Sequence, residues 1–176
     1  PVKALLEPAY ITARAGEVDP EAISVTEDVK PGLYESPDTT HFSVMDKWGN
    51  AVANTTTISL SLGSGVVVEG AGFLLNDEMD DFSAKPGEPN SFGLIGGWAN
   101  KVEPGKRMLS SMSPTIVRRD GRNYLVTGSP GGPRIITTTL QVLLNVIDHG
   151  MNIQSAVSAP RIHHQWLPEE IRIEQG

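Results

Sequence analysis

The sequence predicts an α+β fold in a single domain, and three observations indicate it. β-type runs separated by turn residues dominate the chain from residue 41 onward, and one long amphipathic helix follows them. The chain has 176 residues, of which 39% are hydrophobic, with 18 Gly and 13 Pro. This composition is typical of a folded, loop-rich protein, and the length is enough to bury a hydrophobic core.

Charge and cysteine content exclude several classes of function. The net charge is −7, which opposes the clustered Lys and Arg of a nucleic-acid-binding surface. The chain has no Cys, so it has no disulfide, no thiolate metal ligand and no cysteine nucleophile, and the redox compartment stays open. No apolar run reaches the roughly eighteen residues of a membrane span, and the first residues lack the basic and apolar regions of a signal peptide.

The first part of the chain has helix and loop character. Residues 2–14 space their apolar side chains almost as a helix does, which predicts a short amphipathic helix that ends at Gly16. Residues 17–37 are acidic and contain three prolines, which predicts an extended loop. Pro37 restricts the residue before it to extended conformations and stiffens the approach to Asp38.

Two β-hairpins are predicted from alternating apolar and polar runs. Residues 41–46 and 51–59 form the first, around a turn that contains Gly and Asn. Residues 115–118 and 123–127 form the second, through the turn Asp120-Gly121.

The segments between the hairpins are more varied. A glycine-rich bend at 63–65 leads to two further stretches of strand character, 66–68 and 72–75. Residues 76–82 gather acidic and amide side chains in one short loop, which suits a solvated turn, a cation-binding site or a metal site. The loop lacks the ligand spacing of an EF-hand, so a metal site is disfavoured. Residues 85–97 are rich in Pro and Gly, and a loop of this length is a plain connection, a functional lid or a disordered segment.

One long helix is predicted from Pro133 to about His149, and a shorter one follows at 152–159. Pro133 suits the first helical position and Gly150 suits the end. The expected apolar face of the long helix contains Ile136, Leu140, Leu143, Leu144 and Ile147.

Gly131 and Gly132 precede the long helix. Glycines at this position are usual in an ordinary loop, but they also leave N–H groups directed outward at the positive end of the helix dipole. Fixed donors of that kind are what an oxyanion hole requires. The stretch is not a P-loop, because Lys-Ser/Thr does not follow. Residues 162–166 contain two adjacent histidines, which point to opposite sides of an extended chain and therefore suit packing better than a shared metal ion.

Thr39 and Thr40 open the first predicted strand, where β-branched residues are common. A second interpretation is that a Thr here becomes a new N-terminus and acts as a nucleophile. A Thr hydroxyl needs a neighbouring base, and the freed α-amine of the same residue is one. Its pKa of about 7.7–8 leaves a useful neutral fraction near neutral pH.

Four segments decide between these interpretations: residues 39–46, 74–82, 109–115 and 127–132. Their sequences, TTHFSVMD, LLNDEMDDF, LSSMSPT and TGSPGG, occur in this order and resemble the γ-glutamyltranspeptidase family. Precursors of that family cut themselves before a Thr to give a large and a small subunit.

The resemblance extends from Asp38 to about Trp166. It implies an N-terminal-nucleophile αββα sandwich, in which two antiparallel sheets lie between helices, here as a partial chain. Residues 1–38 would be the tail of the large subunit, and residues 39–176 the catalytic small-subunit region, truncated at its C-terminus.

The same resemblance implies the reacting groups. Cleavage would occur between Asp38 and Thr39, and Thr39 would then be the nucleophile. Thr57 matches a Thr that hydrogen-bonds the nucleophile and assists processing. The N–H groups of Gly131 and Gly132 would stabilise the oxyanion.

It also implies how a small γ-glutamyl substrate is held. Glu78 and Asp81 would bind the substrate α-ammonium, because carboxylates supply charge-assisted hydrogen bonds to that cation. Ser110 and Ser111, which composition alone would leave as turn residues, would bind its α-carboxylate. Phe92 stands in the lid where many bacterial relatives have a Tyr, so the hydrogen bond of that hydroxyl is missing.

One departure from the family pattern keeps the substrate open. Ser59 stands where many family members have an Asn that contacts the substrate amino group, and a Ser is shorter. This raises the alternatives of an acylase for glutaryl or poly-γ-glutamyl amides, or of an inactive fragment that retains the fold. The implied partner is the large subunit of the same precursor, which supplies an Arg to the substrate carboxylate. No cofactor, metal or nucleic acid is expected, and family members are usually periplasmic or secreted.

Overall fold

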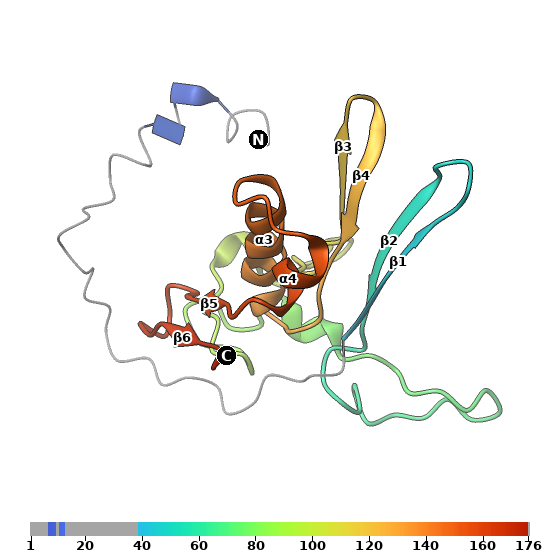
Figure 1. Cartoon of the computed structure of the whole chain (residues 1–176). Coiled ribbons are helices and arrows are strands. Elements are labelled where there is room, and N and C mark those ends of the chain that lie inside the picture. The colour runs from blue at the N-terminus through green and yellow to red at the C-terminus, as the bar shows by residue number, and fades with distance from the viewer. Residues whose placement is uncertain (1–6, 10, 13–38, 176) are drawn as a thin grey trace.

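The computed structural model describes residues 7–9, 11–12 and 39–175, and the description below concerns these residues. They form three two-stranded antiparallel ladders, two short 3₁₀ helices and two well-formed α-helices. The elements in chain order are β1 (Thr40–Met45), β2 (Ala51–Thr56), η1 (Glu78–Asp81), η2 (Trp98–Asn100), β3 (Thr115–Arg119), β4 (Arg122–Thr127), α3 (Arg134–Ile147), α4 (Ile153–Ser158), β5 (Ile162–His163) and β6 (Arg172–Ile173) (Figure 1).

The first predicted hairpin is confirmed as β1 and β2, with Thr40 opposite Thr56. The carboxylate of Asp46 holds its turn by accepting hydrogen bonds from the backbone N–H groups of Trp48 and Asn50, both at 2.9 Å. β2 ends at Thr56, three residues before the predicted end. The reason lies at Ser59, whose φ of 70° places the chain in the left-handed region, where a strand cannot continue.

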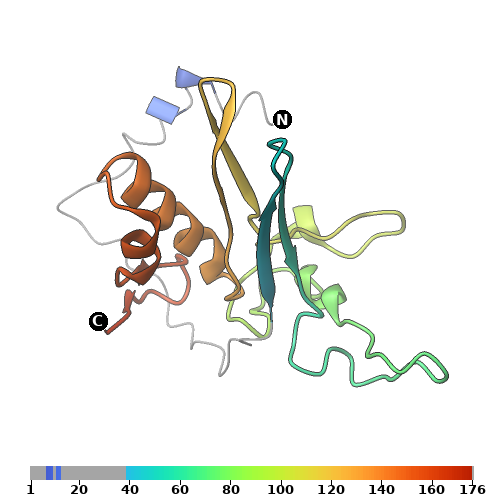
Figure 2. The same ribbon diagram turned by 45° about the vertical axis from the view of Figure 1, so that its right-hand side comes forward.

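The second predicted hairpin is confirmed as β3 and β4. Asp120 and Gly121 both have positive φ, 51° and 74°, as a two-residue hairpin turn requires. The two hairpins are joined at their far ends, where the Asn123 side-chain amide donates to the carbonyl of Gly49 at 2.7 Å. Figure 2 shows α3 and α4 on one side of the β3–β4 hairpin and the β1–β2 hairpin on the other.

The apolar face predicted for α3 is not its buried face in the described part of the chain. The buried residues of α3 are Ile135, Thr139 and Val142, whereas Ile136 and Leu140 are 53% and 50% exposed. Another face of α3 meets the C-terminal segment, residues 153–174. This face is a polar stripe with a four-residue spacing, formed by Thr137, Gln141 and Asn145.

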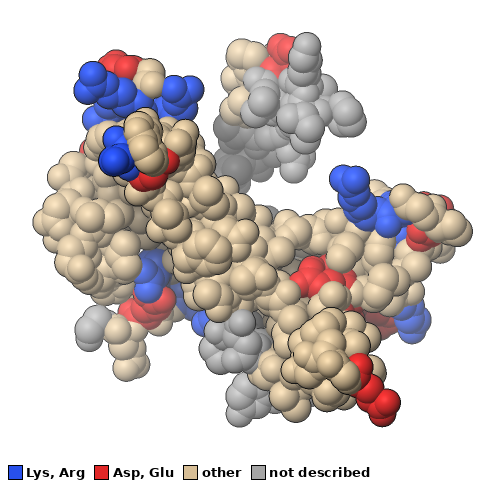
Figure 3. Space-filling view, turned by 90° about the vertical axis from the view of Figure 1, so that its right-hand side faces the viewer, with Lys and Arg blue, Asp and Glu red and all other residues tan. Residues whose placement is uncertain are grey.

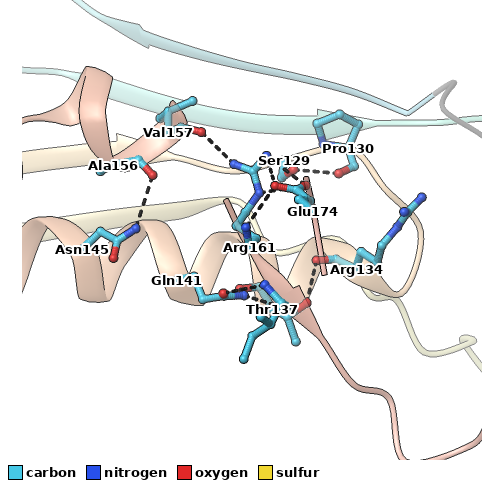
Figure 4. A network of polar contacts seen from close by, with 11 residues as sticks. Ser129, Pro130, Arg134, Thr137, Gln141, Asn145, Ala156, Val157, Arg161 and Glu174 are labelled. Atoms are coloured by element: carbon cyan, nitrogen blue, oxygen red, sulfur yellow. Dashed lines mark hydrogen bonds and ion pairs between the residues drawn. The ribbon is translucent and has the colours of Figure 1, made fainter. Parts of the chain in front are cut away.

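Each residue of that polar stripe bonds a different part of the chain that follows α3: Thr137 contacts His163, and Figure 4 shows the bonds of Gln141 and Asn145. Gln141 both donates to the carbonyl of Ile162, at 2.7 Å, and accepts from its N–H, at 3.0 Å. Asn145 donates to the carbonyl of Ala156 at 3.4 Å. The segment is further held by the ion pair of Arg161 with Glu174, at 2.9 Å. Hydrogen bonds therefore attach these residues to one side of α3, whereas the buried residues Ile135, Thr139 and Val142 lie on another side.

Two further predictions need correction. Residues 66–68 and 72–75 do not form strands but meet in a single bridge between Val67 and Leu74, because positive φ at Gly70 and Gly72 turns the chain between them. The acidic loop contains the 3₁₀ helix η1. Of the helix predicted over residues 2–14, the described residues at 8–9 and 11–12 are helical, and the rest lies outside the described residues, as do Gly16 and the loop 17–37.

The remaining predictions agree with the structure. Residues 85–97 form a loop, α3 ends just before Gly150 at a φ of 65°, and α4 is capped by the side chain of Asn152, which accepts from the N–H of Ser155. Buried hydrophobic residues of the described chain are Phe82, Phe92, Ile135, Val142, Ala156 and Leu167. Within the described residues no helix has the length and apolarity to cross a membrane.

Candidate active site

Thr39 lies directly before β1 and is 8% exposed. Its hydroxyl donates a hydrogen bond to Oγ1 of Thr57, at 3.2 Å. Thr57 Oγ1 also accepts from the N–H of Ser59, at 2.9 Å. Thr40, the next residue, is exposed, because neighbouring residues of an extended chain point to opposite sides. The structure therefore distinguishes the two threonines and places only the hydroxyl of the first against Thr57.

Thr39 faces a small cavity of about 30 Å³, enough for about one water molecule. The cavity gathers residues from both hairpin regions, the acidic loop, the lid and the start of α3. Its lining residues are Thr39, Thr57, Ser59, Asp81, Phe92, Ser110, Ser111, Met112, Gly132 and Ile135. Eight of the residues singled out from the sequence thus meet at one place, although they lie up to 93 positions apart in the chain.

The remaining predicted residues lie nearby or outside the description. Glu78 is not among the cavity-lining residues, and neither is Gly131, which adjoins Gly132 at the head of α3. Asp38 lies outside the described residues.

The two glycines turn the chain into α3. Gly131 has φ 128° and Gly132 has φ 55°, values that a residue with a Cβ adopts only with strain. A Cβ on Gly132 would lie 3.4 Å from the ring of Phe92, so the lid and the helix start are in close contact. The carbonyl groups of both glycines are bonded by the first N–H groups of the helix, Arg134 to Gly131 at 3.0 Å and Ile135 to Gly132 at 3.1 Å.

Some side chains of the acidic loop, residues 76–82, hold neighbouring segments, and others lie at the candidate site. Asp77 accepts a hydrogen bond from the backbone N–H of Leu60, and Asp80 accepts one from the hydroxyl of Ser91 in the lid. Glu78 and Asp81 are three residues apart in a 3₁₀ helix, where such side chains eclipse each other and share a face.

Burial and neighbouring negative charges both act on this pair. Desolvation raises the pKa of Asp81, and the negative charges of Asp80 and Asp77 raise it further. Desolvation likewise raises the pKa of Glu78, and the negative charges of Asp81 and Asp77 add to it. A positive group placed between them would relieve both repulsions. Figure 3 shows acidic side chains set back in a hollow of the molecular surface, with several Lys and Arg side chains at its margins.

The serine pair has unequal hydrogen-bonding roles. The hydroxyl of Ser111 donates to the carbonyl of Gly132, at 3.1 Å, and so ties the serine loop to the helix start. Ser110 Oγ accepts from the N–H of Met112, at 3.2 Å, which leaves the proton of Ser110 to be donated elsewhere. In this arrangement Ser110 is the better donor to an anion in the cavity.

Ser59 and Phe92 complete the cavity wall. Ser59 is buried and lines the cavity. Phe92 is held in a tight lid turn, in which Asn90 Oδ1 accepts hydrogen bonds from the N–H groups of Phe92 and Leu94, both at 3.0 Å. A larger cavity, of about 490 Å³, adjoins the small one and extends between the lid, the start of α3 and the C-terminal segment.

Two buried or partly buried histidines were not predicted to support the site. His163 is 7% exposed and hydrogen-bonded to Thr137 and Gln165, which agrees with the packing role expected for it. His41 contacts Gly128 so closely that a Cβ on Gly128 would lie 2.3 Å from the ring, and burial lowers the pKa of His41. A spacing pattern could not reveal these contacts, because they join segments far apart in the chain. Among the described residues, no group of three or more His, Asp or Glu is placed to hold a metal ion.

Comparison with known proteins identifies the family. The model of the gamma-glutamyltranspeptidase family matches residues 1–176. The chain belongs to the gamma-glutamyltranspeptidase family. The glutathione hydrolase proenzyme of Pseudomonas aeruginosa is 61% identical over 170 residues, which cover 97% of this chain and 30% of that protein. The chain thus spans about three tenths of the length of this relative and of the glutathione hydrolase proenzyme of Escherichia coli.

Solved structures of the family have the same fold. A threonine-to-alanine mutant of the Helicobacter pylori gamma-glutamyltranspeptidase superimposes with a TM-score of 0.75 at 65% identity, over 77% of this chain and 73% of that chain. An acivicin-inhibited gamma-glutamyltranspeptidase, for which critical roles of the C-terminus in autoprocessing and catalysis are described, gives 0.74 at 66% identity, over 76% and 71%. The predicted α+β fold of the N-terminal-nucleophile type is confirmed, and the described residues supply part of its sandwich.

Proposed function

We propose that the protein containing this chain transfers or hydrolyses the γ-glutamyl group of glutathione and other γ-glutamyl amides, as a γ-glutamyltransferase and glutathione hydrolase. The observation that carries the proposal is the buried Thr39 hydroxyl, bonded to Thr57 at 3.2 Å beside Asp81, Ser110 and Gly132 in one cavity. Membership of a family whose relatives are glutathione hydrolase proenzymes supports the reaction class.

The first step is self-cleavage before Thr39. The Thr39 hydroxyl attacks the carbonyl carbon of Asp38, and the peptide nitrogen leaves as the amine of Thr39, so the acyl group moves from nitrogen to oxygen. Water then hydrolyses this ester, which releases the Asp38 carboxylate and frees both the amine and the hydroxyl of Thr39. Thr57, whose oxygen accepts from the Thr39 hydroxyl, orients that hydroxyl.

The freed amine is the base for the second reaction. It takes the proton of the Thr39 hydroxyl as the oxygen attacks the γ-carbonyl carbon of the substrate. The N–H groups of Gly131 and Gly132 stabilise the oxyanion, because they stand at the positive end of α3 where that negative charge develops. The leaving amine receives the proton, and the γ-glutamyl ester on Thr39 passes to water or to an amino acid.

Recognition of the substrate uses both charges of its α-carbon. Asp81 and Glu78 bind the α-ammonium, and Ser110 donates to the α-carboxylate; Ser111 joins it when its hydroxyl turns away from the carbonyl of Gly132. The ring of Phe92 covers the bound glutamyl group. The two carboxylates suit an ammonium because burial and neighbouring negative charges raise their pKa values, and a bound cation offsets the cost of ionising them.

Ser59 favours a second candidate function. It occupies the cavity wall where many family members have Asn, so an acylase for glutaryl or poly-γ-glutamyl amides is the alternative. Turnover of γ-glutamyl and of glutaryl p-nitroanilide by the intact protein separates the two. No turnover of either compound, with Asp38 still joined to Thr39, would favour an inactive protein that retains the fold.

The large subunit of the same precursor is the proposed partner, with the boundary between residues 38 and 39. Large hydrophobic side chains of α3, including Ile136, Leu140 and Leu144, are exposed in the described chain, which spans about three tenths of its curated relatives. We propose that the rest of the precursor covers them. Periplasmic or secreted location, which family resemblance suggests, is tested by assaying activity in fractionated cells.

Variants of the precursor test the nucleophile. Thr39→Ala should leave the bond after Asp38 intact and abolish acyl transfer, because both reactions need its hydroxyl. Thr39→Ser should keep part of both, and the matched control Thr40→Ala should still be cut before residue 39. Intact-mass measurement decides the outcome. Cleavage of the Thr39→Ala precursor at that bond without added protease would refute self-processing by this residue.

A further inference from the structure

A line of hydrogen bonds connects α3, the C-terminal segment and the lid. Thr137 Oγ1 lies 2.8 Å from Nδ1 of His163, and Nε2 of His163 lies 2.9 Å from Oε1 of Gln165. The Gln165 amide nitrogen then donates to two backbone carbonyls, that of Leu167 at 3.0 Å and that of Phe92 at 3.3 Å. The last of these bonds joins residues 73 positions apart and ends on the residue whose ring meets Gly132.

The donors and acceptors along this line fix its orientation. Carbonyl oxygens only accept, so the end of Gln165 that faces Phe92 and Leu167 must be its NH₂ group. Oε1 of Gln165 therefore faces His163 and requires a proton on Nε2. The Thr137 hydroxyl has one proton, which it donates either to Nδ1 of a neutral His163 ring or to the carbonyl of Arg134, 3.1 Å away; in the second case Nδ1 carries a proton and donates to Thr137 Oγ1. The Gln165 amide therefore has one favoured orientation, since a flipped amide would lose its bonds to the carbonyls of both Phe92 and Leu167.

The lid has few other attachments of this kind. Asn90 holds the turn from within the lid itself, and Ser91 bonds Asp80 of the acidic loop. Gln165 holds the lid from the opposite side, through the backbone of Phe92. His163 is 7% exposed and Phe92 is 9% exposed, so these bonds lie where water competes weakly.

We propose that Gln165, oriented by His163 and Thr137, is a positioning residue that fixes the Phe92 carbonyl and thereby holds the Phe92 ring against Gly132. This inference rests on the proposed function, because the cavity under that ring is the proposed γ-glutamyl site. Gln165 does not line the small cavity that contains Thr39, although it lines the larger cavity beside it, and we assign its effect to the bond with the lid. Its loss is expected to weaken capture of the substrate more than the chemical step.

The decisive variant is Gln165→Glu in the full precursor. It keeps an acceptor for His163 and nearly the same shape, but it replaces the NH₂ donor by a carboxylate oxygen that repels the carbonyls of Phe92 and Leu167. Gln154→Glu is the matched control, since it makes the same chemical change on the exposed surface of α4, where Gln154 bonds Ser158. We expect Gln165→Glu to raise KM for γ-glutamyl p-nitroanilide about two- to tenfold, the effect of one net hydrogen bond. Its kcat should change less, and Gln154→Glu should change neither.

A double-mutant cycle with Phe92→Ala separates positioning from general damage. If Gln165 acts through the ring, Gln165→Glu should add no further increase in KM when the ring is already absent. An equal increase in both backgrounds, or a fall in kcat as large as the rise in KM, would overturn the proposal.

Hydrogen exchange supplies a readout that does not depend on activity. Amides of residues 85–97 should exchange faster in Gln165→Glu and at the wild-type rate in Gln154→Glu, as followed by mass spectrometry. Unchanged exchange of the lid in Gln165→Glu would refute the positioning role. If the wild-type precursor had no γ-glutamyl activity, the proposed function would fail, and this exchange measurement would still decide the role of Gln165.

Discussion

Replacing Asp81 by Asn removes one negative charge from the cavity that contains Thr39, with little change in shape. Asp81 lines this cavity, whereas Glu78 shares its face of η1 but does not reach the lining. The two carboxylates should therefore contribute unequally to binding an α-ammonium. A hydrogen bond to a charged group contributes about 1.5–3 kcal/mol, so its loss corresponds to roughly 10- to 150-fold in kcat/KM.

We expect Asp81→Asn to fall at the lower end of that range, because its amide oxygen still accepts a hydrogen bond, and Asp81→Ala to approach the upper end. Glu78→Gln acts only through a partly solvated charge and should cost up to about fivefold, the effect of a screened ion pair. Glu103→Gln is the matched control, since that carboxylate pairs with Lys101 and Lys106 on the surface. The assay is kcat/KM for γ-glutamyl p-nitroanilide with the intact protein.

The pH dependence gives the same prediction a second test. The pKa of Asp81 is raised in the folded chain, so the unliganded carboxyl keeps its proton to a higher pH than an ordinary Asp. Ammonium binding requires the ionised form, and KM should therefore rise as pH falls through the raised pKa. Asp81→Asn should flatten this acid limb.

The stability effect of the same variant has the opposite sign. A raised pKa means that the folded state is penalised above that pKa and relieved below it. Asp81→Asn should therefore raise the melting temperature at pH 7, and the gain should vanish as pH falls through the raised pKa of Asp81. A lower melting temperature at pH 7, or a greater loss of kcat/KM in Glu78→Gln than in Asp81→Asn, would refute the reasoning.

Three further predictions concern fold and specificity. Gly128→Ala should lower the free energy of unfolding by about 1–3 kcal/mol, since its Cβ would lie 2.3 Å from the His41 ring. The control Gly97→Ala has open space around the new Cβ and should change that free energy little. Equal unfolding curves for the two variants would contradict this prediction. Ser59→Asn should fold normally, because Asn tolerates φ 70°. It should raise the ratio of the turnover rate of γ-glutamyl p-nitroanilide to that of glutaryl p-nitroanilide. An unchanged ratio would mean that residue 59 does not select the substrate. Asp46→Ala should destabilise the first hairpin at neutral pH, because turn hydrogen bonds lower the pKa of Asp46, and the loss should fade as pH falls through that lowered pKa. Thermal unfolding across this pH range is the measurement, and a loss independent of pH would count against it.

The sequence by itself determined the elements whose cause is local. Alternation of apolar and polar residues, with Asp120-Gly121 in a turn that needs positive φ, was enough to place the hairpins. Gly150 was enough to place the end of α3, because a positive φ after the last turn suits glycine best. The four family segments determined the family, since their residue types occur together in a fixed order.

Only the tertiary structure decided which of these residues meet. It showed that Asp81 lines the cavity and Glu78 does not. It also showed that the Ser111 hydroxyl donates to the carbonyl of Gly132, whereas Ser110 Oγ accepts from the N–H of Met112 and can still donate its proton. The structure also showed that α3 buries Ile135, Thr139 and Val142, whereas Ile136 and Leu140 of the expected apolar face are exposed. The physical reason is that hydrogen bonds and close contacts between distant segments depend on three-dimensional distance, which neither periodicity nor spacing along the chain encodes.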